Sequence, residues 1–230
     1  MSRDLKQAGN DLLASGLVAL GLARSGSQRE LLDLYLSEVE LWNSRVDLVR
    51  VRDFGELVLR HALDCLAAAP VLASLAATSW IDVGSGAGLP GIPLAIYLPD
   101  RRFTLVERSG KRAAFLRGVV AVLRLSDRVE VLEEDVGRMT HCFPGAVFRA
   151  FRPFTPDVVR TLSRIIAAGG FLVAYKGTRN AIDAEIGTLA TDFESCTVER
   201  LTVPFLAEER HLVLARRRSQ PVPDPRTHPQ

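Results

Sequence analysis

A glycine-rich turn between a predicted strand and a predicted helix constrains this chain more than any other sequence feature. Residues 79–83 read as a short β-rich run, residues 84–91 contain four glycines, and an apolar helical stretch follows. Glycine has no Cβ, so its backbone adopts positive φ angles and approaches a ligand closely. A helix that begins at such a turn also presents free N–H groups to that ligand. The turn therefore predicts an α/β fold that holds a nucleotide-like ligand at residues 84–91.

Short β-rich runs alternate with helical stretches beyond this turn. Such alternation is typical of a parallel, doubly wound sheet with helices on both faces. Apolar alternation near the C-terminus predicts two more strands, which form an antiparallel pair at one edge of the sheet. The expected strands are 79–83, 103–107, 129–132, 146–150 and 171–175, then 198–203 and 212–215. We therefore expect a Rossmann-like α/β fold with a mostly parallel sheet.

The length of the chain favours one hydrophobic core. With 230 residues and 47% hydrophobic side chains, the chain buries one core more readily than two equal ones. A capping box at Ser27 opens a predicted helix at 27–43, and a second helix is predicted at about 54–69, where Pro70 is expected to end it. We expect an N-terminal helical extension at 1–77 packed on a core domain at 78–216. Residues 217–230 contain four prolines and are predicted to form a disordered tail.

Composition argues against several classes of protein and site. The three cysteines form no C-x-x-C pair and leave one odd, so we expect no disulfide framework, no zinc site and no other metal. Reduced thiols indicate a cytoplasmic protein, which we expect to be a monomer. No apolar run approaches the roughly 20 residues that span a bilayer, so no membrane association is expected. Asp4 and Asp11 interrupt the flank of a short apolar stretch at 12–23, which argues against a signal peptide.

The glycine spacing is compatible with two kinds of ligand. Residues 86–91 spell G-x-G-x-x-G, and Glu107 lies about twenty residues further on, as in dinucleotide sites. However, Asp82 and Val83 run directly into Gly84, and an acid just before the first glycine is a feature of S-adenosylmethionine sites. Pro90 also lacks the N–H that a pyrophosphate would bind at the start of the helix. S-adenosylmethionine is therefore favoured, and the alternative is a nicotinamide-dependent oxidoreductase, for which no hydride-site base is evident.

Acidic residues at the ends of two later strands are candidates for binding the nucleoside. A carboxylate at Glu107 can accept hydrogen bonds from both ribose hydroxyls in either kind of site. Three consecutive acids end the third strand, and Asp135 is favoured among them to accept the adenine amino group. Val136 is then expected to pack against the adenine ring.

Several ordered motifs, which together cover about residues 30–216, resemble the glucose-inhibited division protein B family. They are Val-Arg-Asp at 51–53, Leu-Arg-His-Ala-Leu-Asp at 59–64, the loop and helix at 82–95, Gly-Lys-Arg at 110–112 with Phe-Leu-Arg at 115–117, Arg-Ala-Phe at 149–151, Lys-Gly at 176–177 and Glu-Arg-His-Leu-Val at 209–213. The members of that family are guanine-N7 methyltransferases of 16S ribosomal RNA. The resemblance implies a class I methyltransferase fold, S-adenosyl-L-methionine as cofactor, and the small ribosomal subunit as partner.

The resemblance also places cofactor contacts on Gly84, Leu89, the Val136-Gly137 pair and Arg149. This chain departs from the family, which usually has Ala-Glu at 136–137, a serine at 148 and Asp-Ser at 107–108. The departure at Gly137 removes a side-chain contact and motivates a second alternative, an RNA-binding relative that has lost catalysis. The candidate cofactor site comprises Asp82, Gly84, Ser85, Gly86, Gly88, Leu89, Glu107, Asp135, Val136, Gly137 and Arg149.

The chemistry that the resemblance implies needs no catalytic base, because guanine N7 carries a lone pair and no proton. The enzyme then works by positioning the reactants. Arg149 is the candidate catalytic residue, expected to hold guanine O6 or a phosphate. His61 and Asp64, three residues apart on a predicted helix, either line the mouth of the site or form a structural pair that pins the helix. The candidate RNA contacts are His61, Asp64, Arg112, Arg117, Lys176 and Arg210.

Overall fold

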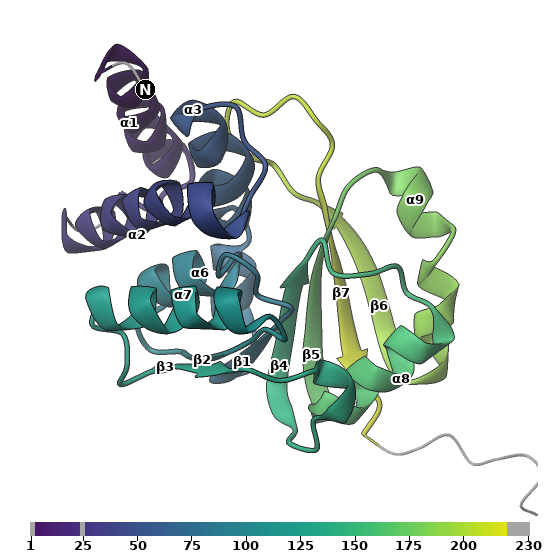
Figure 1. Cartoon of the computed structure of the whole chain (residues 1–230). Helices are drawn as coiled ribbons and strands as arrows, with labels where there is room; N and C mark the ends of the chain where they lie inside the picture. Colours follow the sequence, from purple (N-terminus) through teal and green to yellow (C-terminus); the bar gives the residue numbers. More distant parts are fainter. Residues whose placement is uncertain (1–2, 24–25, 220–230) are drawn as a thin grey trace, which may run out of the picture.

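A computed structural model describes residues 3–23 and 26–219. Its centre is a seven-stranded sheet in the order β3-β2-β1-β4-β5-β7-β6 (Figure 1). Strands β1 to β5 are parallel, whereas β7 runs antiparallel to both β5 and β6. The strands are β1 (Ser79–Val83), β2 (Arg102–Val106), β3 (Val129–Leu132), β4 (Phe143–Arg149), β5 (Ile166–Lys176), β6 (Phe193–Arg200) and β7 (His211–Arg217). The predicted mostly parallel sheet with an antiparallel edge pair is confirmed.

Helices cover both faces of this sheet. Figure 1 shows α6 and α7 on one face with α2 outside them, and α8 on the other face. The helices after the first strand are α6 (Gly91–Tyr97), α7 (Gly110–Val122), α8 (Pro156–Ile165) and α9 (Arg179–Asp183), with short 3-10 helices η2 (Val136–Arg138) and η3 (Ile186–Thr191). Successive side chains of a strand point to opposite faces. Trp80 therefore joins the hydrophobic cluster under α6 and α7, and its neighbour Ile81 joins the cluster under α8.

The helices before the sheet share its core. They are α1 (Arg3–Ala19), α2 (Gly26–Val46), α3 (Phe54–Leu57), the π-helical turn η1 (Val58–Leu63), α4 (Asp64–Leu66) and α5 (Ala69–Ser74). One continuous cluster contains Leu13 of α1, Leu36 of α2, Leu63 of η1 and Trp80 of β1. The expected boundary near residue 77 falls inside this cluster, and the division into an extension and a core domain stays a prediction.

The second predicted helix differs from the structure in two ways. It passes through the π-helical turn η1, and Pro70 opens α5 instead of ending a helix. Proline is tolerated in the first turn because the N–H at that position has no partner within the helix. No stretch long enough to span a membrane was expected, yet residues 54–74 reach that length and contain an 18-residue window of mean hydropathy 1.4. Of that window 56% is buried inside the protein, so packing in the core accounts for its apolar character.

The C-terminal strand ends close to the predicted boundary of the tail. Strand β7 runs to Arg217, and Arg218 N donates to Asp192 O at 3.0 Å. The predicted tail at 217–230 therefore begins inside ordered structure, and residues 220–230 lie outside the described residues.

Candidate active site

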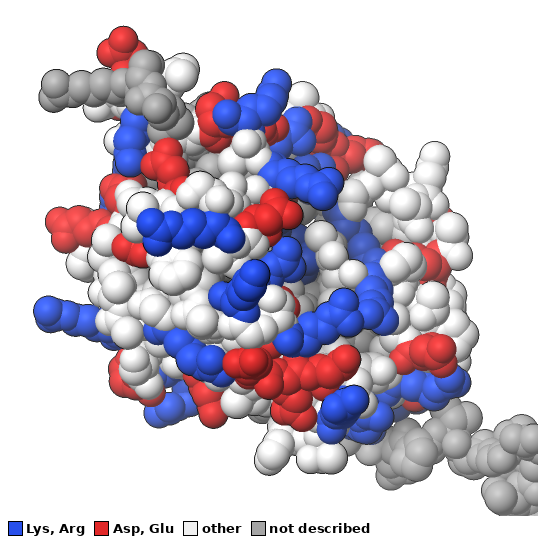
Figure 2. Space-filling model, viewed as in Figure 1, with Lys and Arg blue, Asp and Glu red and all other residues white. Residues whose placement is uncertain are grey.

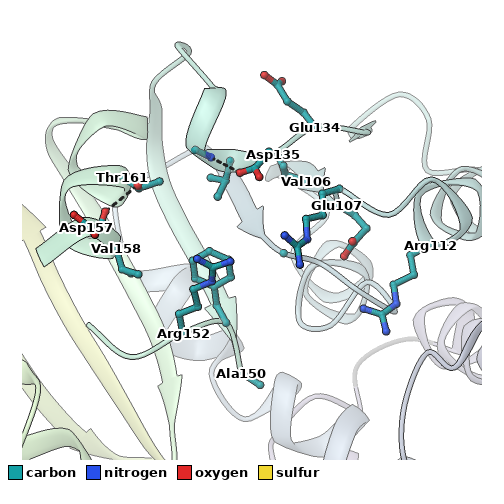
Figure 3. A pocket seen from close by; sticks show the side chains of 15 residues that line it. Val106, Glu107, Arg112, Glu134, Asp135, Ala150, Arg152, Asp157, Val158 and Thr161 are labelled. Carbon is teal, nitrogen blue, oxygen red and sulfur yellow. Dashed lines mark hydrogen bonds between the residues drawn. The ribbon is translucent and has the colours of Figure 1, made fainter. Parts of the chain in front are cut away.

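A cavity of about 350 Å³ opens where β1, β2 and β4 end and where η2 begins after β3 (Figure 3). The strand order reverses between β1 and β4, and ligands of open α/β sheets bind at such a reversal, outside the carboxyl ends of the strands. The candidate cofactor residues that line this cavity are Gly84, Glu107, Asp135, Val136 and Gly137. Asp82, Ser85, Gly86, Gly88, Leu89 and Arg149 are not part of its wall.

The glycine turn has the backbone that its sequence requires. Gly84, Gly86 and Gly88 have φ values of +71, +57 and +88, which L side chains rarely adopt. A Cβ at Gly84 would lie 3.0 Å from Cδ2 of Phe151, on the cavity side, and a Cβ at Gly88 would lie 2.6 Å from Cγ1 of Ile92. The bare backbone at residue 84 therefore forms part of the cavity, and Gly88 lets the turn lie close to α6.

Glu107 holds the glycine turn from the end of β2. Its Oε2 accepts a hydrogen bond from Gly86 N at 3.0 Å, and its Oε1 accepts one from Ser109 N at 2.9 Å. The residue is buried and still lines the cavity. Each carboxylate oxygen keeps a second lone pair for a ligand. Glu107 therefore shapes the site and presents acceptor oxygens to it.

Asp82 lies behind the turn. The side chain is fully buried, and Oδ2 accepts a hydrogen bond from Gly91 N at 2.9 Å, which ties the start of α6 to β1. Its Oδ1 has no hydrogen-bond partner within residues 3–23 and 26–219. Burial raises the pKa of Asp82 to about 7, although the bond from Gly91 opposes the rise. The acid before the first glycine thus supports the turn from beneath and does not reach the cavity.

The segment after β3 forms the opposite wall. Asp135 Oδ1 accepts a hydrogen bond from Gly137 N at 2.8 Å (Figure 3). Val136, between them in the sequence, also lines the cavity. A Cβ at Gly137 would press on Asp135 Oδ1 at 3.1 Å. Residue 137 therefore contributes no side chain to this wall, and Glu134 and Asp135 are the acidic residues that line it.

A tyrosine from α2 holds the glycine turn, which sequence reasoning missed. Tyr35 is fully buried, and its hydroxyl donates to Ala87 O at 2.8 Å. Its helical spacing indicated a core residue, and the one available signal was its hydroxyl, which needs a partner when buried. The contact joins an N-terminal helix directly to the candidate cofactor site.

We expect Tyr35→Phe to destabilise the protein by about 1–3 kcal/mol, because it leaves the buried Ala87 carbonyl without its donor. The free energy of unfolding from urea titration measures this loss. Tyr97→Phe is a control, since Tyr97 is also a helix tyrosine but has no comparable bond to the turn. Equal stability of Tyr35→Phe and wild type would contradict the assigned contact.

Arg149, the candidate catalytic residue, points toward the π-helical turn. Its Nη1 donates to Arg60 O at 3.1 Å and lies 3.3 Å from Asp64 Oδ2, and its Nη2 lies 2.6 Å from His61 Nδ1. Its Nε is buried without a partner in the described part of the chain. The contacts bring together the two residues that the sequence placed on one helix face. They fit the interpretation of His61 and Asp64 as a structural pair and place that pair against the end of β4.

The charges in this cluster are unusual for their residue types. Burial, together with Arg149, lowers the pKa of His61 to about 3, so the ring is neutral and Nδ1 accepts from Arg149. Burial raises the pKa of Asp64, and Arg149 and Arg210 oppose that rise. Arg210 Nε lies 3.2 Å from Asp64 Oδ1. One buried carboxylate is thus shared by two arginines from β4 and from the connection before β7.

His61 is expected to make stability depend on pH. Its pKa falls from 6.5 in the unfolded chain to about 3, so its contribution is complete above pH 6.5 and is lost as the pH falls toward 3. Between pH 7.5 and 5 we expect wild type to lose about 1–2 kcal/mol relative to His61→Gln. Because its pKa is raised, Asp82 makes stability fall with rising pH, opposite to His61. This contribution is present in both proteins and cancels in their comparison. Parallel urea titrations test it, and equal pH profiles would contradict a neutral His61.

The other candidate RNA residues have different surroundings. Arg112 lines the cavity and donates to Asp47 O at 3.1 Å. Arg117 is half exposed and pairs with Glu133 at 3.1 Å. Lys176 is mostly buried, lies 2.5 Å from Glu185 Oε1 and stands 4.0 Å from the centre of the Phe154 ring. Lys176 is therefore engaged within the fold, whereas Arg112 faces the site.

A smaller cavity of about 230 Å³ adjoins the first. Ala150, Phe151 and Arg152 line both, and the second is completed by Phe148, Pro153, Tyr175 and Lys176. The guanidinium of Arg152 lies 5.7 Å from the centre of the Phe151 ring. Ala150 has a φ of 54, an uncommon value at a turn where strain often marks a functional site. The sequence pointed to Phe151 as part of the Arg-Ala-Phe motif without a role for it, and it gave no sign of Arg152, which follows directly.

Basic side chains gather around these cavities. Figure 2 shows Lys and Arg along the hollow between α2 and α7 on one side and α9 on the other, with acidic side chains below it. Arg108, Arg112 and Arg152 belong to the wall of the first cavity. Within the described ranges, no three His, Cys, Asp or Glu residues are grouped so that they could hold a metal ion. The site therefore combines a nucleotide-sized cavity with a surface suited to a polyanion.

Residues 28–213 match the sequence model of one family, GidB, described as rRNA small subunit methyltransferase G. Curated relatives named Ribosomal RNA small subunit methyltransferase G include those of Treponema pallidum, 41% identical over 88% of this chain and 91% of the relative, and Ralstonia nicotianae, 41% identical over 88% and 92%. The one from Salmonella schwarzengrund is 39% identical over 86% and 93%.

Solved structures share the fold. A predicted O-methyltransferase from Agrobacterium tumefaciens has a TM-score of 0.56 and 26% identity over 68% of this chain and 80% of its own. A putative S-adenosylmethionine-dependent methyltransferase from Methanococcus maripaludis has a TM-score of 0.58 and 15% identity over 81% and 94%. The second likeness concerns the fold alone.

Proposed function

Because the chain belongs to the rRNA small subunit methyltransferase G family, we propose that it transfers a methyl group from S-adenosyl-L-methionine to N7 of a guanine in 16S ribosomal RNA. The observation that carries this proposal is the cavity at the strand reversal, with the bare backbone of Gly84 in its wall. The chain is a methyltransferase with the class I fold, and no finding supports the nicotinamide-dependent alternative.

S-adenosyl-L-methionine is the cofactor, and the residues present fit it. It supplies an electrophilic methyl group on a sulfonium sulfur when bound. Gly84 leaves room that a Cβ would fill, Glu107 presents acceptor oxygens suited to ribose hydroxyls, and Val136 offers an apolar surface beside Asp135 for the adenine. Asp82, Ser85, Gly86, Gly88 and Leu89 act from behind the wall by holding the shape of the turn.

The second cavity is our candidate for the guanine. It shares Ala150, Phe151 and Arg152 with the first cavity, so a base there lies next to a ligand in the first. An unstacked base is commonly held on an aromatic ring or a guanidinium plane, and Phe151 and Arg152 provide both. Guanine N7 needs no base to remove a proton, so this chain's residues act by orientation and by excluding water.

Arg149 lines neither cavity, and 18% of its side chain is exposed. Its proposed role is to orient the substrate from beside the two cavities through guanine O6 or a phosphate, with His61 and Asp64 holding its guanidinium in place. Arg112 is a proposed contact to the RNA backbone, because it lines the first cavity and its guanidinium can pair with phosphate. Arg210 is a second candidate, although it already pairs with Asp64. Arg117 and Lys176 are weaker candidates, since each already pairs with a glutamate. We place the activity in the cytoplasm, where a monomer is expected to act on the small ribosomal subunit.

Mapping of 7-methylguanosine in 16S ribosomal RNA from cells with and without this protein tests the proposal. We expect one guanine to lose its methyl group in the deletion strain and to regain it when the purified protein and S-adenosylmethionine are added to subunits from that strain. Methylation of another atom of the RNA would leave the family membership unaffected and would refute the assignment to N7. Binding of the RNA and cofactor without transfer would favour the inactive relative that the Gly137 departure suggests. Titration with S-adenosylhomocysteine and with NAD separates the two cofactors.

A further inference from the structure

The connection between β6 and β7, residues 201–210, reaches from the sheet edge to the N-terminal helices (Figure 1). Leu201 N donates to Arg210 O at 2.8 Å and closes its base. Two ion pairs dock it against η1 and the start of α4: Glu208 pairs with Arg60, and Arg210 Nε lies 3.2 Å from Asp64 Oδ1. Because Asp64 also contacts Arg149, the connection is held beside the end of β4. We call residues 201–210 the β6–β7 arm.

The tip of the β6–β7 arm carries an aromatic residue in an unfavourable conformation. Leu206 N donates to Val203 O at 3.2 Å, so residues 203–206 form a β-turn with Pro204 in its second position. Phe205 occupies the third position with a φ of 65. A β-turn with a positive φ at its third position favours glycine or asparagine there. A side chain in the left-handed region costs free energy that glycine avoids.

Burial does not compensate for this conformation. The side chain of Phe205 is 59% exposed, whereas Leu201 and Val203 anchor the arm in the hydrophobic core. Neither the hydrogen bond that closes the turn nor the packing of the arm on the core therefore requires an aromatic ring at residue 205. Strained and exposed residues that the fold does not need are candidates for function.

We propose that Phe205 is a stacking platform for an unpaired RNA base near the target guanine. This inference rests on the proposed function, which supplies RNA as the substrate. Single-stranded RNA is recognised by stacking bases on aromatic rings beside basic groups that bind phosphates. Arg60 and Arg210 hold the arm through their ion pairs, and Figure 2 shows further Lys and Arg side chains along the hollow of this face. Phe205 thus extends the RNA-binding surface beyond the reacting base.

The test compares Phe205→Ala, Phe205→Gly and Phe205→Trp with Leu41→Ala. Leu41 is a matched control because it is also an apolar side chain that is 59% exposed, on α2. KM is measured on hypomethylated small ribosomal subunits, and the dissociation constant on protein-free 16S ribosomal RNA. We expect Phe205→Ala and Phe205→Gly to raise both about 5- to 100-fold, the range that removal of one base–aromatic stack produces. Phe205→Trp and Leu41→Ala are expected to keep wild-type values.

Further measurements separate stacking from a structural role. Phe205→Gly relieves the left-handed conformation, so its melting temperature is expected to be no lower than that of wild type. The affinity for S-adenosylhomocysteine is expected to be unchanged in all four variants. RNA is expected to quench the fluorescence that Phe205→Trp adds.

Wild-type RNA affinity in Phe205→Ala would overturn the inference. A rise of KM on intact subunits without a rise of the dissociation constant on protein-free RNA would also overturn it, because the Phe205 ring would then contact a ribosomal protein. Failure of the wild-type protein to methylate 16S ribosomal RNA would instead refute the proposed function. The binding measurements on protein-free RNA would still decide the role of Phe205.

Discussion

Arg149→Ala is expected to lower kcat for methyl transfer by about 100-fold or more, the effect of removing a preorganised charge from an active site. The structure adds a second expectation. Arg149 is mostly buried and contacts both Asp64 and His61, so its removal leaves a buried carboxylate with Arg210 as its remaining partner. Breaking a buried pair from one side costs about 3–5 kcal/mol of stability. Activity therefore has to be measured at a temperature where urea titration shows the variant to be folded.

Two further variants separate these effects. Arg149→Lys keeps the charge near Asp64 but loses the planar fork, so we expect most of the stability and little of the activity to return. Arg216→Ala is the matched control, since Arg216 is half exposed and its pair with Glu194 is worth at most about 1 kcal/mol. Wild-type turnover by Arg149→Ala would refute its assigned role. Loss of stability without loss of turnover would restrict Arg149 to holding the π-helical turn.

The second large effect is expected at the glycine turn. Gly84→Ala places a Cβ at a residue with φ +71, which costs about 1–2 kcal/mol of stability. The added Cβ also lies 3.0 Å from Cδ2 of Phe151, so the Phe151 ring, which lines both cavities, has to move slightly. We expect the affinity for S-adenosylhomocysteine to fall about 10- to 100-fold, equivalent to about 1.4–2.8 kcal/mol. Isothermal titration measures the affinity, and thermal unfolding measures the stability.

Gly118→Ala is the control for this prediction. Gly118 lies in α7, and a Cβ there would meet no atom within 4 Å. Alanine is the better helix former by about 0.5–1 kcal/mol, so this variant is expected to be slightly more stable and to bind the cofactor normally. Unchanged S-adenosylhomocysteine affinity in Gly84→Ala would show that residue 84 does not contact the ligand and would remove the main support for the cofactor site.

The sheet and the glycine turn were predictable because their causes are local. A strand of a parallel sheet is a short apolar run, and the runs at 79–83 and 129–132 coincide with β1 and β3. Positive φ values at Gly84, Gly86 and Gly88 belong to the residue type itself. The later strands are longer than predicted, since β4 begins at Phe143 and β5 at Ile166. Their early residues are paired by neighbouring strands, a contact that no local pattern reports.

The contacts that support the site depended on side-chain partners distant in the sequence. Tyr35 and Ala87 are 52 residues apart, and Arg149 and His61 are 88 apart. The sequence identified each as a core or charged residue, but a buried hydroxyl or guanidinium can be satisfied by many groups. For the same reason Asp82 was expected in the cofactor site and instead supports the turn from behind.

The sequence alone determined an α/β chain with a glycine turn that approaches a nucleotide-like ligand, because hydrophobic periodicity and backbone freedom are properties of neighbouring residues. Tertiary structure decided that Arg149 faces Asp64 and not the first cavity, that Phe151 and Arg152 separate two cavities, and that Phe205 is exposed at the tip of a docked arm. These features follow from packing, which selects one partner for each buried polar group and leaves other side chains exposed.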